Sequence, residues 1–123
     1  QANLMGEKSD RIYIEHILEM IDEVAMHLKK GGRKSFYNNL TVRQATLRSL
    51  QLMSESTQRL SSSTKKSIKG IPWQDISDFR NVLVHDYMGS IDLNVVWDII
   101  EESLPDLKKI ISDYHRKNYD RKI

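Results

Sequence analysis

The 123-residue sequence contains no cysteine, only two prolines and only five glycines. Without cysteine, the protein cannot form disulfides, use a thiolate nucleophile or hold zinc or an iron–sulfur cluster through sulfur. No apolar run approaches the ~18 residues that a membrane-spanning helix needs. The composition is compatible with a reducing cytoplasm, where we expect the protein to lie, away from membranes.

Neither sign of charge dominates, since 19 Lys and Arg face 17 Asp and Glu. Contact with a polyanion must therefore come from a local patch rather than from a generally basic surface. Hydrophobic residues make up 39% of the chain, enough for the core of one domain. We expect residues 1–8 to be an expression remnant or disordered, residues 9–116 to form the domain and residues 117–123 to be a basic tail.

Apolar residues recur at helical spacing between a few breaks. A first helix is expected from Ser9 or Asp10, as its cap, to Gly31, and a short helical turn at 35–38. A second is expected from Thr41, its cap, through Leu60. The apolar positions predicted for the core of these two helices are Ile14, Ile17, Leu18, Ile21, Val24, Ala25, Leu28, Val42, Ala45, Leu50, Met53, Thr57 and Leu60.

A polar stretch at 61–69 precedes a third helix that opens at Pro72 and Asp75. The fourth is capped by Asp92, and Pro105 should kink or split it because proline lacks the backbone donor. The core positions expected here are Ile76, Phe79, Leu83, Val96 or Trp97, Ile100, Leu104, Leu107, Ile111 and Tyr114. The pattern predicts an all-α fold, an up-and-down bundle of four or five helices.

The third helix carries an unusual polar set within residues 79–87. At 100° per residue, Asn81 and His85 lie nearly opposite the apolar stripe, whereas Arg80 and Tyr87 share its flank. A helix of a soluble bundle would not normally cluster arginine, asparagine, histidine and tyrosine among good core residues. The simpler alternative is a bundle helix with a snorkelling arginine and a surface histidine.

The spacing of Arg80, a polar Asn81 and His85 resembles the motif of the HEPN superfamily. With Tyr87 two residues later, it is similar to the HepT-like toxins. Further similarity lies in residues 13–18, 71–73 and 92–98, so the resemblance covers roughly residues 10–114. It implies a HEPN-like homodimeric bundle in which two copies of the motif line one cleft.

The resemblance also implies metal-independent RNA cleavage with no cofactor. His85 would be the acid–base group, because imidazole titrates near ~6.5. Arg80 would hold the phosphate, and Asn81 would orient either His85 or the phosphate. The product would be a 2′,3′-cyclic phosphate on tRNA or mRNA. The alternative function is a non-catalytic HEPN module that binds a minimal nucleotidyltransferase.

HepT-like toxins are typically paired with MntA-like nucleotidyltransferase antitoxins, which add AMP to the tyrosine of the motif. The resemblance therefore implies a toxin–antitoxin system in which AMPylation of Tyr87 repels RNA from the cleft. Without modification, Tyr87 would be a half-buried aromatic residue that closes the helix end.

Other features of the sequence give weaker functional signals. Lys65, Lys66 and Lys69 can track an RNA backbone and Trp73 can stack on a base, or they can be a solvated loop and a core residue. The basic residues of 115–122 are expected to be a frayed tail. Glu23 and His27 have metal-ligand spacing, but no second pair matches, so no metal site is expected. His16 is expected to face a neighbouring helix or solvent.

Overall fold

The computed structural model describes residues 2–85 and 91–119, with side chains from residue 9 onward, and its regular elements are all helical. The long helices are α1 (Ala2–His27), α3 (Leu40–Gln58), α5 (Trp73–Val84) and α7 (Leu104–Asn118), and α7 continues from α6 (Leu93–Asp98) through a π-helical turn, η1 (Ile99–Ser103). Two short helices, α2 (Gly32–Asn38) and α4 (Ser62–Ser67), connect the long ones. The predicted all-α bundle is confirmed, while the homodimer stays a prediction.

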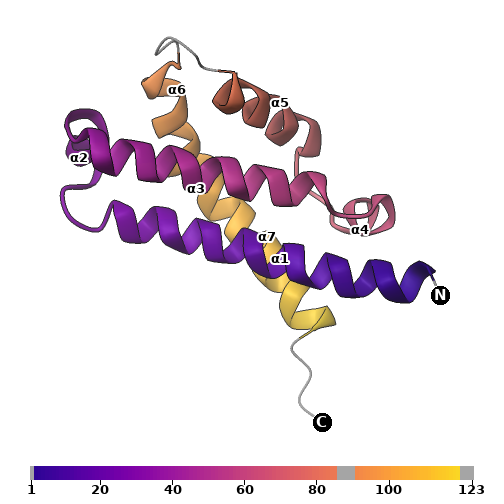
Figure 1. Ribbon diagram of the computed structural model, residues 1–123. Helices are drawn as coiled ribbons and strands as arrows, with labels where there is room; N and C mark the ends of the chain where they lie inside the picture. The colour runs from indigo at the N-terminus through magenta and orange to yellow at the C-terminus, as the bar shows by residue number, and fades with distance from the viewer. Residues whose placement is uncertain (1, 86–90, 120–123) are drawn as a thin grey trace.

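The chain reverses direction between successive long helices, so that α1 and α3 run antiparallel, side by side (Figure 1). Helix α5 packs along α3, and α7 crosses behind and contacts α1 (Figure 1). Helix α3 therefore lies between the first helix and the motif helix. Among the described helices, none is long and apolar enough to cross a bilayer.

The core is built mainly from α1 and from the α6–α7 segment. Ala25, predicted for the core, is exposed. The other predicted positions of these helices are largely buried: Ile14, Ile17, Ile21, Val24, Val96, Trp97, Leu104, Leu107 and Ile111. In helix α3 the predicted Leu50, Met53 and Thr57 are buried. Val42 and Ala45 are only partly buried, and further small polar residues such as Thr46 lie fully inside. The hydroxyls of Thr46 and Thr57 donate hydrogen bonds to backbone carbonyls of the same helix, at 2.8 and 2.6 Å. Periodicity of apolar residues alone could not predict the burial of these further polar residues.

Two predicted caps are wrong. Helix α1 begins at Ala2, so neither Ser9 nor Asp10 caps it. Helix α3 is capped by Asn39 and not by Thr41, because the extended backbone of Asn39 lets its side chain accept the Val42 N–H at 3.1 Å. The cap at Asp92 is confirmed, since its carboxylate accepts the Asn94 N–H at 3.0 Å.

Pro105 divides the last helix as predicted. The five residues of η1 lie just before it, and Pro105 occupies the first turn of α7. A proline removes one donor from the regular helical pattern and crowds the preceding turn. The wider π-helical turn absorbs this disruption and the helix continues.

The stretch 61–69, expected to be a polar loop, contains helix α4. The Ser61 side chain caps it by accepting the Thr64 N–H at 3.3 Å. Asp10 of α1 is buried and accepts hydrogen bonds from the Ser61 hydroxyl and from Thr64, at 2.6 and 2.5 Å. Burial by itself raises the pKa of Asp10, but the hydrogen bonds from Ser61 and Thr64 outweigh it, and the pKa lies below its ordinary value.

The C-terminal basic segment is helical further than predicted. Helix α7 runs to Asn118, past the expected boundary at 116. His115 is not frayed, because its Nε2 lies 2.8 Å from Glu15 Oε2 on α1. The hydrogen bond from His115 is the main reason that the pKa of Glu15 is lowered. Arg121 and Lys122 lie outside the described residues.

Candidate active site

Arg80 and Asn81 lie on the last turns of α5, and His85 directly follows its end. The helix ends at Val84, and the His85 N–H caps it by donating to the Asn81 carbonyl at 3.0 Å. The side chains of Asn81 and His85 are exposed. Tyr87 lies outside the described residues, so its predicted position on the flank of the helix stays a prediction.

Arg80 lies on a different side of α5 from His85, between α5 and α3. Its side chain is 30% exposed, and Nη2 lies 3.7 Å from Glu55 Oε2 on α3. Nη1 donates to Asn81 Oδ1 at 3.3 Å. Among the described residues, none accepts a hydrogen bond from its buried Nε. Arg80 is thus held by a carboxylate on one side and by the motif asparagine on the other.

Glu55 is the residue of this site that the sequence reasoning missed. Gln51 fixes it from the preceding turn of α3, with Nε2 donating to Oε2 at 3.0 Å. A signal was present in the sequence, because Glu55 is the only acidic residue between Glu23 and Asp75. Recognising its role required the packing of α3 against α5, which joins positions 25 residues apart.

Helix α5 buries none of its residues completely. Ile76, Phe79 and Leu83 were predicted to form a core stripe, but they are only half-buried at the edge of the core. On the outer side of α5, Val82 is 53% exposed. The motif helix therefore lies on the surface of the single chain, where its apolar and polar residues remain accessible.

The other three histidines make contacts between helices. His16 shares a 2.6 Å hydrogen bond with Ser56, as expected for a residue facing a neighbouring helix. His27 and Glu23, the pair with metal-ligand spacing, both contact the buried Ser49 hydroxyl, at 3.1 and 3.2 Å. Within the described residues, no group of three metal-binding side chains occurs. These histidines join helices, whereas His85 lies at an exposed helix end.

The predicted RNA-binding residues lie at the other end of α5 from the motif. Trp73 is half-buried and donates through Nε1 to the Lys65 carbonyl at 3.1 Å. The Lys65 ammonium lies 6.0 Å from the centre of the indole ring, and Lys66 and Lys69 are exposed. At 1.5 Å per residue, roughly 16 Å of helix separates Trp73 from the end of the motif. The structure joins Trp73 to Lys65 but does not bring either to His85.

Comparison with known proteins identifies the family. The family described as "Ribonuclease HepT-like" matches residues 14–114, most of the chain and all of α3 and α5. The chain belongs to the HepT-like ribonuclease family. The resemblance found in the spacing of Arg80, His85 and Tyr87 is thereby confirmed at the level of the family.

Several relatives match the chain in sequence over nearly their whole length. The chain is 29% identical over 105 residues to "Putative RNase MJ1380" of Methanocaldococcus jannaschii, covering 85% of this chain and 95% of that protein. It is 26% identical to "Putative RNase TTE0752" of Caldanaerobacter subterraneus, with 89% and 97% covered. It is also 26% identical to "Probable ribonuclease HepT" of Thermococcus cleftensis, with 83% and 92% covered. No solved structure matches significantly.

Proposed function

We propose that this chain is a metal-independent ribonuclease in which His85 moves the proton and Arg80 binds the scissile phosphate. The observation that carries the proposal is the placement of Arg80, Asn81 and His85 at the C-terminal end of one surface helix, with Arg80 contacting Asn81. Membership of the HepT-like family and the ribonuclease names of the relatives support it.

In this reaction the imidazole of His85 removes the proton of a ribose 2′-hydroxyl. The 2′-oxygen attacks the adjacent phosphorus, and the bond from phosphorus to the 5′-oxygen of the next nucleotide breaks. The 5′-oxygen takes up a proton and leaves as a hydroxyl, and the other product ends in a 2′,3′-cyclic phosphate. The reaction needs ribose, so DNA of the same sequence would not be cut.

Arg80 has the donor geometry that phosphate binding requires. A guanidinium carries five N–H groups in a planar fork, and the contacts to Asn81 and Glu55 use only part of this capacity. Negative charge grows on the phosphate oxygens as the 2′-oxygen attacks, so a cation held in place stabilises the transition state. Glu55 acts as a positioning residue, because it holds the guanidinium against α3 without reaching the outer face where His85 lies.

We expect Glu55→Gln to raise the KM for RNA several-fold and to lower kcat less than replacement of Arg80 does. The amide keeps an acceptor near Arg80 but loses the charge that holds it. Steady-state cleavage kinetics with a labelled oligonucleotide would measure both constants. Glu23→Gln, also a half-buried carboxylate on a long helix, is the matched control and should leave both unchanged. Equal effects of the two substitutions would reject a role for Glu55 at the site.

We further propose that the active unit is a homodimer. Arg80 and His85 lie on different flanks of α5, so a second motif helix would bring further donors and a second base to one phosphate. The exposed outer side of α5, including Val82, supplies apolar surface for such a contact. Light scattering should give the mass of two chains.

The test of the ribonuclease proposal is cleavage of total tRNA and mRNA by the purified protein in excess chelator, followed by analysis of the product ends. Cyclic-phosphate ends are expected. Intact RNA, after mass spectrometry has excluded AMP already bound to the protein, would instead favour the non-catalytic module that partners a nucleotidyltransferase. Cleavage that requires a divalent metal ion would contradict the mechanism.

The finer biological proposal is that this ribonuclease is the toxin of a toxin–antitoxin pair, silenced by an MntA-like nucleotidyltransferase that adds AMP to Tyr87. Its support is the position of Tyr87 in the sequence, two residues after His85. The attached phosphate would place negative charge beside Arg80 and compete with RNA for it.

Incubation with such a nucleotidyltransferase and ATP should increase the intact mass by whole AMP units and abolish RNA cleavage. Tyr87→Phe should retain cleavage activity, gain no mass and stay active under the same treatment. Tyr37→Phe is the matched control and should still be modified and silenced. Mass gain on Tyr87→Phe would place the modification elsewhere.

A further inference from the structure

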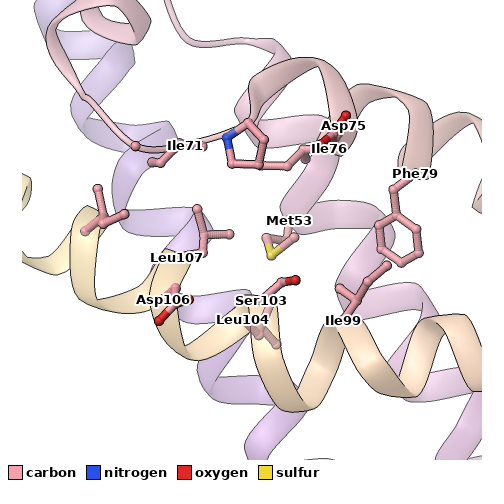
Figure 2. A pocket seen from close by; sticks show the side chains of 13 residues that line it. Met53, Ile71, Asp75, Ile76, Phe79, Ile99, Ser103, Leu104, Asp106 and Leu107 are labelled. Carbon is pink, nitrogen blue, oxygen red and sulfur yellow. The ribbon is translucent and has the colours of Figure 1, made fainter.

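A groove separate from the motif runs between α5 and the η1–α7 segment. Its volume is about 420 Å³, within the ~300–1,000 Å³ of protein ligand sites. Ile76 and Phe79 of α5 form one wall, and Leu104, Leu107 and Ile110 of α7 line the other. Met53 of α3 lies between them (Figure 2). This apolar groove has no part in the proposed cleavage of RNA.

Two carboxylates flank the groove on opposite sides. Asp75 belongs to the first turn of α5 and Asp106 to the first turn of α7, and both are exposed (Figure 2). Among the residues that the structure describes, neither forms an ion pair. The groove therefore combines apolar walls with two accessible negative charges.

The surrounding sequence is strongly acidic, although the whole chain is close to neutral. Residues 74–106 contain eight Asp and Glu and a single basic residue, Arg80, while the rest of the chain has eighteen Lys and Arg against nine Asp and Glu. Phosphates of RNA would be repelled from the groove. A symmetric contact that placed this groove against the same groove of a second copy would bring their Asp75 and Asp106 carboxylates together, whereas Val82, on the outer side of α5 proposed for the homodimer, does not line the groove.

We propose that this groove binds a basic amphipathic helix of a protein partner. Its apolar side chains would pack between Ile76, Phe79 and Leu107, and its Lys or Arg side chains would reach Asp75 and Asp106 at the rims. A helix is the natural occupant of a groove between two helices. This proposal does not depend on the ribonuclease activity.

The probe is a fluorescein-labelled synthetic helix of leucine and lysine, with leucine at positions three and four residues apart. The control peptide has the same composition with leucine scattered around the helix. Fluorescence anisotropy with the full chain measures Kd, and methyl NMR of isoleucine and methionine locates the site. Binding should shift the methyl signals of Met53, Ile76 and Ile110 and leave those of the exposed Ile12 and Met26 unchanged.

Three variants distinguish specific binding of the peptide in the groove from non-specific attraction to the acidic residues. Asp75→Asn with Asp106→Asn should weaken binding about tenfold, as expected for two exposed charge pairs. Asp78→Asn with Asp98→Asn removes equal charge from the same acidic region but not from the groove, and should weaken it less than about twofold. Ser103→Trp, at an exposed groove position, should fill the groove and weaken binding at least about tenfold.

Each contrary result overturns the proposal. Equal binding of the scattered peptide, equal weakening by the two double variants, or unchanged groove methyl signals would show only non-specific attraction. If Ser103→Trp splits a dimer in light scattering, the groove is covered by a second copy instead. Circular dichroism of every variant confirms that the helical fold is retained.

Discussion

Replacing His85 with alanine is expected to lower the rate of RNA cleavage by about 10²–10⁴-fold, the usual contribution of a general base. His85 caps an exposed helix end, so the loss should come without unfolding of the bundle. Cleavage of labelled RNA in excess chelator measures the rate, and circular dichroism measures the fold. Arg80→Ala should cost about 10²–10³-fold, because it removes the cation that stabilises the developing charge.

The matched control for this experiment is His27→Gln. His27 is a half-buried histidine of α1 that contacts Ser49, far from the motif in sequence and on another helix. Its replacement should leave cleavage unchanged within about twofold even if stability falls slightly. If His85→Ala retains the wild-type rate, His85 is not the base, and the non-catalytic binding module becomes the better explanation of the motif.

Asp10→Ala is expected to lower the free energy of unfolding by roughly 3 kcal/mol, the largest effect that we expect on stability. Asp10 is only 3% exposed and accepts hydrogen bonds from the Ser61 N–H, the Ser61 hydroxyl and the Thr64 hydroxyl. Alanine would leave the buried Thr64 hydroxyl and the part-buried Ser61 N–H without this acceptor. The Lys65 carbonyl of α4 also accepts a hydrogen bond from Trp73, the first residue of α5. Loss of the Asp10 contacts to α4 should therefore also make the start of α5 less rigid.

Urea unfolding measures this loss, and pH identifies its cause. The folded-state pKa of Asp10 lies below the unfolded value, so its stabilisation is present above the ordinary Asp pKa of ~3.9 and declines as pH falls through the folded-state pKa. The difference between wild type and Asp10→Ala should therefore be constant from about pH 5 to 7 and shrink below about pH 4. Asp22→Ala, which removes an exposed ion pair with Lys108, should cost less than about 1 kcal/mol. Similar losses in the two variants would contradict this account.

Local sequence predicted the helices well where one face is apolar. The cap at Asp92 and the break at Pro105 are local features, and both are confirmed. The apolar stripes of α1 and α7 are also local, and they are confirmed except at the exposed Ala25. Asp10 and Thr41 were predicted to cap helices because their residue types are typical of caps. Both predictions were wrong, since each residue lies within a helix. Whether such a side chain caps its own helix or bonds another one depends on what lies beside it in three dimensions.

The motif itself could be identified from sequence, because Arg80, Asn81, His85 and Tyr87 occupy one short segment. Their spacing predicted the family, and a helix fixes the angle between Arg80 and His85 once it forms. Glu55 could not be assigned in this way, because its role depends on contact between two helices. The same holds for Trp73 and Lys65, whose hydrogen bond requires α4, a helix that the polar sequence did not predict.

The sequence by itself determined the all-α fold, the division of the last helix at Pro105 and the polar residues of the motif, because periodicity and proline act over one or two turns. The tertiary structure decided which flank of α5 faces α3, how Glu55 holds Arg80, and that Asp75 and Asp106 lie on opposite sides of an apolar groove. These features join positions 25 and 31 residues apart. Such contacts depend on how whole helices pack, which no local pattern specifies.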